Sequence, residues 1–250
     1  MEFVGIIPAR YASTRFPGKP LADIGGMTMI ERVYRQASKS LDNVWVATDD
    51  TRIFDTVTAF GGNAIMTSDK HRSGTDRCYE AYCNIASKAD VIINIQGDEP
   101  FIDPAQIEAL KSCFTDQCCR QIATLVREFD PKKGFDALFD PNTPKVVFDD
   151  NMNALYFSRS IIPYVRNAEW KEWLNKAKFH THIGMYAYHA DILKELVKLP
   201  QSSLEIAESL EQLRWLQAGY KIKIGITNVD TIGIDTPADL EAARRLLAES

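Results

Sequence analysis

The feature that most constrains the fold is a run of mainly β-branched residues, Val91-Ile92-Ile93-Asn94-Ile95. A nearly continuous apolar run of this kind suits a strand that is buried on both faces of a parallel sheet. Parallel strands cannot be joined by tight turns, so each pair requires a crossover connection. Further short apolar runs precede this one, at Val4–Ala9, Val44–Thr48 and Ala64–Met66.

Helical patterns separate these runs. Apolar residues recur at helical spacing in 27–38 and 53–60, and helices are also predicted at 76–87 and 104–114. Alternation of strands and helices implies right-handed crossovers. The predicted fold class is therefore α/β: a doubly wound, mostly parallel, Rossmann-like sheet with helices on both faces. Ligands bind such sheets at the carboxyl ends of the strands, so the loops of interest follow Ala9, Thr48, Met66 and Ile95.

The middle of the chain has a different character. Strands are predicted at 121–127, 145–148 and 154–158, and the turn signal Asp149-Asp150-Asn151 makes the last two a hairpin. The segment 170–179 fits a short helix or a loop, and 182–189 fits a strand. We predict a single domain, 1–250, whose nucleotide-binding core comprises 1–120 and 191–250, with a smaller β-rich inserted lobe at 121–190.

The last part of the chain returns to helical patterns. Helices are predicted at 191–199 and 204–217, followed by a strand at 220–227. A closing helix at 236–249 has Thr236 as its N-cap and Pro237 at its first position.

Composition excludes several classes of protein. The formal net charge of −5 argues against broad nucleic-acid binding, which needs a basic face. No apolar run approaches the roughly 20 residues that span a bilayer, and the N-terminus lacks the pattern of a signal peptide, so a cytoplasmic protein without a membrane partner is expected. The five cysteines form no CxxC pair and lack the spacing of a zinc site, which favours reduced thiols.

A basic loop follows the first predicted strand, from Pro8 to Pro20. A triphosphate needs fixed cations and hydrogen-bond donors, because charge accumulates on its oxygens as the α-phosphorus is attacked. Arg10 and Lys19 can supply the cations, and Ser13 with the loop backbone can supply donors. Neither GxxxxGK[ST] nor GxGxxG is present, and the loop taken alone also fits a solvated basic turn.

Two carboxylates lie in loops that suit a metal site. Asp98 follows the β-branched run in Gln96-Gly97-Asp98-Glu99-Pro100, where Gly97 permits close approach of a ligand. Asp235 precedes the closing helix in the segment Gly233–Leu240. Mg²⁺ prefers one or two carboxylates together with phosphate oxygens and water. Read locally, both also fit ordinary polar turns.

A further polar turn, His71-Arg72-Ser73-Gly74-Thr75-Asp76-Arg77, follows the third short strand. Hydroxyls and main-chain amides on such a turn can bind a pyrimidine edge. Thr75 can also cap a helix that begins at Asp76, and the two interpretations are compatible.

Together these motifs resemble the sugar-acid cytidylyltransferase family, and the resemblance runs nearly end to end. Ile7-Pro8-Ala9-Arg10, Ser13-Thr14-Arg15 and Pro17-Gly18-Lys19-Pro20 match its opening motif. With Tyr11-Ala12, the opening is similar to the 3-deoxy-manno-octulosonate (Kdo) cytidylyltransferases, the CMP-Kdo synthetases. The Q-G-D-E-P, G-x-D-T-P-x-D-L, H-x-S-G-T-x-R, Y-F-S-R, H-x-G-x-Y and L-E-Q-L-R patterns are also present.

The resemblance implies roles for individual residues. Arg10, Lys19 and Asp98 would be catalytic, and Asp98 with Asp235 would hold Mg²⁺, while Glu99 is assigned to structure and His71 is disfavoured as a base. Nucleotide-binding residues would be Pro8, Ala9, Arg10, Ser13, Thr14, Arg15, Lys19, Arg72, Ser73, Gly74, Thr75, Gln96 and Gly97. Sugar-binding residues would be Gln96, Tyr156, Arg159, His182, Tyr186, Glu211 and Gln212, of which the last two also fit a plain amphipathic helix face. The segment Asn167–Lys178 receives no role.

The resemblance also implies the reaction and the partners. The expected enzyme transfers CMP from CTP to the anomeric hydroxyl of Kdo, giving CMP-Kdo and pyrophosphate for lipopolysaccharide biosynthesis. A homodimer formed through the middle lobe is implied as well. Two alternatives remain: a CMP-sialic acid synthetase, which shares the opening motif, and a catalytically silent nucleotide-binding protein on the same fold.

Overall fold

The computed structural model describes residues 1–12, 16–114, 122–230 and 233–248. The chain forms two compact units. The first consists of Met1–Glu108, Ala187–Val197 and Val229–Ser250, and the second of Ala109–Tyr186 and Lys198–Asn228. The predicted division placed all of 191–250 with the nucleotide-binding core, whereas 198–228 pack within the second unit.

Four parallel strands form the sheet of the first unit in the order β6-β1-β4-β5. They are β1 (Phe3–Ala9), β4 (Val44–Thr48), β5 (Ala64–Met66) and β6 (Val91–Asn94). Every residue of β6 is buried, as its β-branched sequence predicts. In register, Ala9 lies beside Thr48 and Thr48 beside Met66, so the polar loops that follow these strands leave from one edge of the sheet.

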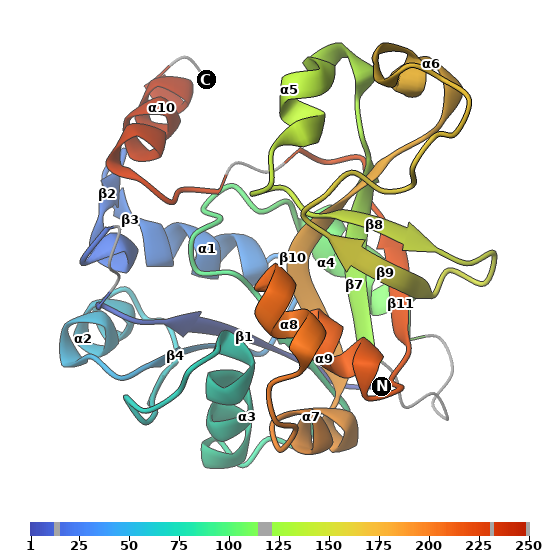
Figure 1. Cartoon of the computed structure of the whole chain (residues 1–250). Coiled ribbons are helices and arrows are strands. Elements are labelled where there is room, and N and C mark those ends of the chain that lie inside the picture. Colours follow the sequence, from blue (N-terminus) through green and yellow to red (C-terminus); the bar gives the residue numbers. More distant parts are fainter. Residues whose placement is uncertain (13–15, 115–121, 231–232, 249–250) are drawn as a thin grey trace. The chain divides into compact units, whose positions relative to one another are not determined.

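Helices cover both faces of this sheet. Figure 1 shows α1 (Met29–Ala37) on one face of β1 and β4, and α3 (Gly74–Asn84) on the other. The remaining elements that contribute to the first unit are η1 (Lys19–Leu21), the antiparallel pair β2 (Asp23–Ile24) and β3 (Met27–Thr28), α2 (Thr51–Ala59), α4 (Pro104–Ser112), α7 (Ala190–Leu196) and α10 (Pro237–Ala248). The predicted α/β class with a mostly parallel sheet is confirmed.

Two helix starts differ from the sequence prediction. Helix α1 begins at Met29 rather than Met27, because Met27 and Thr28 pair with β2 and the Thr28 side chain accepts a hydrogen bond from the Glu31 amide. Helix α3 begins at Gly74, and Ser73, not Thr75, is its N-cap. The Ser73 hydroxyl accepts from the Asp76 amide, which satisfies one of the unpaired donors of the first turn.

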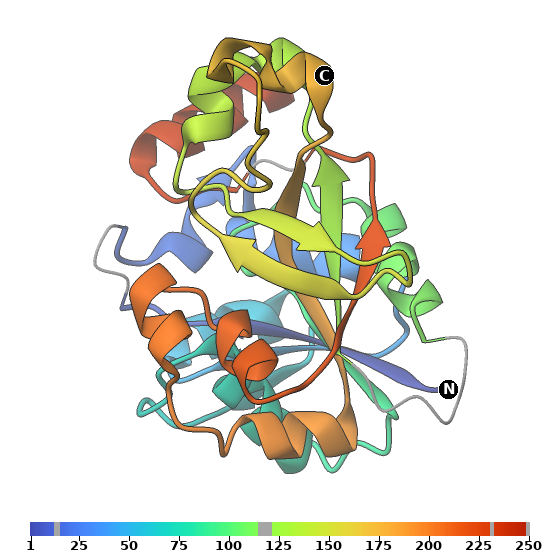
Figure 2. The same ribbon diagram turned by 45° about the vertical axis from the view of Figure 1, so that its right-hand side comes forward.

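The second unit is built around β7 (Ile122–Glu128), β8 (Lys145–Phe148), β9 (Ala154–Ser158), the part of β10 (His180–His189) up to Tyr186, and β11 (Ile222–Ile226). Strand β11 is parallel to β7, and β8 pairs antiparallel with β9 and β10. The predicted hairpin of β8 and β9 is confirmed. Figure 2 shows its turn beside β11, where the Ile224 amide donates to the Met152 carbonyl.

The prediction of one continuous helix at 204–217 is wrong. The structure has α8 (Ser203–Glu208) and α9 (Gln212–Gln217), separated by Ser209 in the left-handed region with φ 51°. The Arg159 guanidinium donates to the carbonyls of Glu208 and Ser209, and these contacts stabilise the break. A side chain distant in sequence therefore overrides the local helical pattern.

Short helices cover one end of the second unit. They are η2 (Pro131–Lys133), α5 (Gly134–Phe139), η3 (Trp170–Glu172) and α6 (Trp173–Lys176). Phe129, Leu138, Trp173 and Phe179 form a buried cluster beneath them. Of the two interpretations of 170–179, a short helix is therefore the one observed. Among the described residues, no helix has the length and apolar character needed to cross a membrane.

Candidate active site

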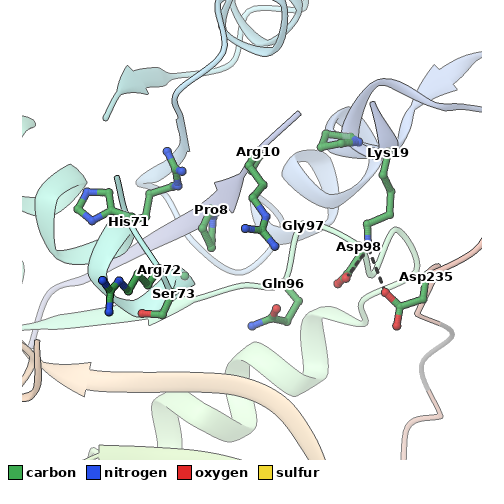
Figure 3. A pocket seen from close by; sticks show the side chains of 14 residues that line it. Pro8, Arg10, Lys19, His71, Arg72, Ser73, Gln96, Gly97, Asp98 and Asp235 are labelled. Carbon is green, nitrogen blue, oxygen red and sulfur yellow. Dashed lines mark hydrogen bonds and ion pairs between the residues drawn. The ribbon is translucent and has the colours of Figure 1, made fainter. Parts of the chain in front are cut away.

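A cavity of about 270 Å³ opens in the first unit beyond the carboxyl ends of β1 and β6. This is the edge at which an α/β sheet binds its ligands. Figure 3 shows polar and charged side chains converging on it. It is lined by Pro8, Ala9, Arg10, Lys19, Pro20, His71, Arg72, Ser73, Gly74, Arg77, Gln96, Gly97, Asp98 and Asp235.

The structure brings together most of the residues predicted for nucleotide, metal and catalysis. Thr75 is not among those that line the cavity: it is buried within α3, where its hydroxyl lies 3.5 Å from that of Tyr188. Ser13, Thr14 and Arg15 lie outside the described residues.

Lys19 links the two predicted metal-binding carboxylates. Its Nζ lies 2.8 Å from Oδ2 of Asp98 and 3.2 Å from Oδ1 of Asp235 (Figure 3). The segment that carries Asp235 is fixed beside Asp98, because the Ile234 amide donates to the Asp98 carbonyl at 2.9 Å. The residues fit a hard divalent cation, since two carboxylates from separate loops already converge on a single positive group.

Two glycines lie where loops that line the cavity come close to one another. A Cβ atom at Gly97 would lie 3.1 Å from the main-chain oxygen of Pro8, and one at Gly74 would lie 3.2 Å from Cγ of Pro8. The first contact is with backbone, which cannot move aside cheaply. Gly97 thus lets the loop after β6 lie against the end of β1, and this places Gln96 and Asp98 beside Arg10 (Figure 3).

The start of α3 supplies main-chain donors to the cavity. The helix has 11 residues, and its N-terminal end is favourable for an anion because its amides and its dipole point outward there. The preceding loop is anchored by Glu80, whose carboxylate accepts from the Ser68 amide and contacts Nε2 of His71. The pKa of Glu80 is lowered by these hydrogen bonds, which outweigh the opposing effect of its partial burial.

Three lining residues were given no role from the sequence: Pro20, His71 and Arg77. Arg77 is buried, and its guanidinium donates to Thr67 Oγ1 at 2.7 Å and to Asp49 Oδ2 at 3.1 Å. The sequence signal was present in part, because His71 and Arg77 are the first and last residues of the H-x-S-G-T-x-R motif. The ion pair between Arg77 and Asp49 joins α3 to the loop after β4, and the motif does not indicate this contact.

Glu99 has an unusual environment behind Asp98. Burial, with a smaller contribution from the Asp98 charge, raises the pKa of Glu99 to about 7. Its Oε2 atom is buried without a hydrogen-bond partner among the described residues. Glu99 is not part of the cavity lining, and its assignment to structure stays a prediction.

The predicted sugar-binding residues other than Gln96 lie in the second unit. Tyr156 is on β9, His182 and Tyr186 are on β10, and Glu211 and Gln212 stand at the start of α9. The rings of His182 and Tyr186 are 5.3 Å apart, and Tyr186 contacts Trp215 of α9 at 5.1 Å. Gln212 is buried, and its Nε2 atom has no hydrogen-bond partner among the described residues.

His182 is held in its neutral form. Its Nε2 atom lies 2.9 Å from the Thr124 hydroxyl, and its ring packs edge-on against Phe157 at 5.0 Å. Burial lowers the pKa of His182 to about 3. The imidazole is therefore uncharged at neutral pH and cannot supply a positive charge to an anionic ligand.

Arg159 is already engaged within the protein. Its guanidinium donates to the carbonyls of Glu208, Pro141 and Ser209, and its amide donates to the Glu208 carboxylate. The Ser158 hydroxyl donates to the other Glu208 oxygen at 2.7 Å. Arg159 thus fixes the turn that precedes Glu211 and Gln212: two of its five guanidinium N–H groups donate to this turn and a third donates to Pro141.

Comparisons with known proteins cover nearly the whole chain. Residues 4–223 match the family model described as Cytidylyltransferase. A Parabacteroides distasonis protein named 3-deoxy-manno-octulosonate cytidylyltransferase is 63% identical over 249 residues, which cover 99% of each chain. An Escherichia coli protein of the same name is 46% identical, with 98% of this chain and 95% of that protein covered.

Solved structures agree with these matches. A CMP:2-keto-3-deoxy-manno-octonic acid synthetase complexed with CTP superposes with a TM-score of 0.90 and 45% identity, over 100% of this chain and 99% of that one. The 4-diphosphocytidyl-2C-methyl-D-erythritol synthase from Anaerococcus prevotii has a TM-score of 0.62 and 13% identity, over 99% of both chains. The second likeness concerns the fold alone.

Proposed function

We infer that this chain, which belongs to the cytidylyltransferase family, transfers CMP from CTP to the anomeric hydroxyl of Kdo and releases pyrophosphate. The observation that carries the inference is the cavity at the ends of β1 and β6, where Arg10, Lys19, Asp98 and Asp235 meet. It lies in a chain that matches Kdo cytidylyltransferases over nearly its full length.

Mg²⁺ is the proposed cofactor, held by Asp98 and Asp235. The support is the donor set: two carboxylates converge, and Lys19 already screens their repulsion. When bound, the ion would neutralise triphosphate charge and lower the pKa of the attacking hydroxyl. Among the described residues no group of three or more His, Cys, Asp or Glu side chains is arranged to hold a metal ion. Mg²⁺ commonly binds one or two carboxylates together with phosphate oxygens and water, and these would complete the coordination.

The residues of the chain contribute mainly position and charge. In the proposed reaction the anomeric oxygen forms a bond to the α-phosphorus while the bond from phosphorus to pyrophosphate breaks. Arg10 and Lys19 stabilise the negative charge that develops on the phosphate oxygens. The start of α3, with Ser73 and Gly74, binds the nucleoside end, and Gly97 lets the loop that carries Gln96 and Asp98 lie against the end of β1.

In the second unit the proposed sugar-binding residues are Tyr156, Arg159, His182, Tyr186, Glu211 and Gln212. In the first unit Gln96 is proposed separately as a sugar contact. The buried amide nitrogen of Gln212 supports this role, because an unpaired buried donor is costly unless a ligand satisfies it. The neutral ring of His182 suits a sugar hydroxyl. Arg159 contributes charge for the sugar carboxylate from a guanidinium that also fixes the turn between α8 and α9.

The cellular setting is proposed from the same resemblance. The product would feed lipopolysaccharide biosynthesis in the cytoplasm, and the protein would act as a homodimer. Leu155 on β9 and Ile226 on β11 are 61% and 50% exposed, and these side chains offer apolar contacts for a second copy. Analytical ultracentrifugation tests the dimer directly.

The reaction is tested by pyrophosphate release with CTP and Mg²⁺, comparing Kdo, N-acetylneuraminate and no sugar, with an EDTA control. Release with Kdo alone, abolished by EDTA, is the expected result. Release with N-acetylneuraminate instead would show that the sugar substrate is N-acetylneuraminate and that the enzyme is a CMP-sialic acid synthetase. CTP binding by calorimetry without release in any mixture would favour the silent nucleotide-binding protein.

A further inference from the structure

We propose that Tyr11 and Arg52 form a clamp that positions Arg10 and Lys19 for the triphosphate. Both are positioning residues, because they act through the loop and not by contact with the reacting atoms. The proposal rests on the proposed function, and it adds a part of the first unit that lies outside the cavity lining.

The clamp begins with the ring of Tyr11. Tyr11 directly follows Arg10, and Gly18 directly precedes Lys19. The Gly18 amide donates to the Tyr11 carbonyl at 3.0 Å, so the chain closes between the two cationic residues. Gly18 has φ 73°, and a Cβ atom there would lie 3.1 Å from Cζ and from the hydroxyl oxygen of Tyr11. The ring therefore packs directly against the Gly18 backbone.

The side chain of Arg52, in the first turn of α2, contacts the same ring. Its Cζ atom lies 3.3 Å from the centroid of the Tyr11 ring, in a close cation–π contact. Asp50 fixes the guanidinium through a fork, with Nε to Oδ1 at 2.9 Å and Nη2 to Oδ2 at 2.6 Å. The pKa of Asp50 is lowered chiefly by its hydrogen bonds with Arg52. The cation is thus oriented before it stacks, and little further side-chain entropy is lost.

The position of Asp50 in the fold shows which elements the clamp connects. Asp50 is the N-cap of α2, where its Oδ1 also accepts from the Arg52 amide at 3.0 Å. Helix α2 follows β4, which pairs with β1 in parallel. The stack consequently ties the loop after β1 to the helix start after β4. Holding Tyr11 and Gly18, the neighbours of Arg10 and Lys19, in place before CTP arrives removes an entropic cost that binding would otherwise include.

Electrostatic attraction between Arg52 and CTP does not explain why Arg52 lies over the Tyr11 ring. The guanidinium is neutralised by the Asp50 carboxylate at 2.6 Å, so its long-range attraction for CTP is small. The Arg52 side chain is 57% exposed, yet its Cζ atom lies over the ring. Arg35 offers a matched comparison: it pairs with Glu31, and its Cζ lies 5.8 Å from the Phe60 ring, away from the cavity.

The experiment is a double-mutant cycle on CTP binding, read by calorimetry with Mg²⁺ and by steady-state kinetics. Arg52→Ala should raise the Kd and the KM for CTP about 2- to 5-fold, the scale of one exposed cation–π contact, with kcat nearly unchanged. Asp50→Asn, which keeps a helix cap but weakens the fork, should raise them by a smaller factor. Arg35→Ala should leave both constants unchanged.

The second arm removes the ring. Tyr11→Leu keeps apolar bulk against Gly18, and Tyr11→Phe keeps the aromatic face and should bind CTP as the wild type does. In the Tyr11→Leu background Arg52→Ala should have no additional effect, because the contact is already lost. Thermal unfolding of each variant separates loss of the clamp from loss of the fold.

Three outcomes decide between the proposals. An effect of Arg52→Ala that persists undiminished in the Tyr11→Leu background would show that its charge acts directly, which overturns the clamp. CTP binding that is the same in the wild type and in Arg52→Ala would also overturn it, while leaving the proposed function intact. Absence of CTP binding by the wild type would overturn the proposed function, and the clamp with it.

Discussion

The ammonium group of Lys19 lies 2.8 Å from a carboxylate oxygen of Asp98, at the mouth of the cavity. The Lys19 side chain is only 15% exposed, so this ion pair is partly shielded from solvent. Asp235 contacts the same ammonium group at 3.2 Å. Lys19 therefore has two roles in one place: it screens two converging carboxylates, and it presents a cation to the triphosphate.

Lys19→Met should reduce turnover about 100- to 1000-fold, the scale for removal of one donor that stabilises the transition state. The methionine keeps most of the side-chain volume but supplies no charge. Lys178→Met is the matched control, because Lys178 forms an exposed pair with Glu128 at 2.9 Å in the second unit. Steady-state pyrophosphate release measures both. Turnover within a factor of a few of the wild type would contradict the role of Lys19.

Asp98→Asn should abolish most activity at every Mg²⁺ concentration. The amide has the shape of the carboxylate but lacks the charge that would hold the cation in place against the triphosphate, so a higher Mg²⁺ concentration should not restore the productive arrangement. Asp103→Asn is the control from the same loop, since Asp103 accepts from the Ala105 amide and asparagine can keep that contact. Turnover of Asp98→Asn close to that of the wild type at every Mg²⁺ concentration would show that Asp98 is not an essential metal ligand.

The sequence predicted the strands of the first unit closely because their signal is local. Buried parallel strands need continuous apolar runs, and β4 and β5 have the predicted bounds. The hairpin of β8 and β9 was predictable for a similar reason, since Asp149-Asp150-Asn151 is a turn signal between two strand patterns. The cavity followed from topology, because the loops after parallel strands meet at one edge.

The errors lie where a distant side chain decides the local structure. Ser73 and Thr75 both fit a helix cap, but Thr75 is buried beside Tyr188, a residue that no local pattern links to it. The break at Ser209 depends on Arg159, which lies 50 residues earlier in the chain. The pair formed by Asp49 and Arg77 was also missed, because each residue alone fits an ordinary loop or helix position.

His182 should make the stability of the protein fall as the pH is lowered below about 6.5, the ordinary histidine pKa in an unfolded chain. The folded-state pKa is about 3, so between these values the unfolded chain binds the additional proton. The contribution is fully present above the unfolded value and is lost progressively as the pH falls, by at most about 1.4 kcal/mol per pH unit.

Urea unfolding of the wild type and of His182→Gln at several pH values between 7 and 5 measures this effect. The variant should show a shallower decline in the free energy of unfolding. Equal slopes for the two proteins would mean that the imidazole is not held neutral by the fold. The pH dependence of the KM for Kdo should be the same in the wild type and in His182→Gln.

Arg159→Lys should destabilise the second unit and weaken sugar binding together. Lysine keeps one positive charge but cannot donate at once to the carbonyls of Glu208, Pro141 and Ser209. Loss of these bonds should lower the free energy of unfolding by about 0.5–1.5 kcal/mol, because water can replace the guanidinium at the exposed carbonyls of Pro141 and Ser209 and only the bond to Glu208 is partly buried. Arg166→Lys, at an exposed position of the same unit, should change neither property.

Glu208→Gln separates the two effects of Arg159. The amide weakens the bonds from the Ser158 hydroxyl and the Arg159 amide, while the guanidinium keeps its charge and its contacts with main-chain carbonyls. If Arg159 binds the sugar carboxylate directly, Glu208→Gln should cost stability with little change in the KM for Kdo, whereas Arg159→Lys should raise that KM about 10-fold or more, the scale of a lost charge-assisted hydrogen bond. Parallel increases in KM for both variants would mean that Arg159 acts only through the turn that carries Glu211 and Gln212.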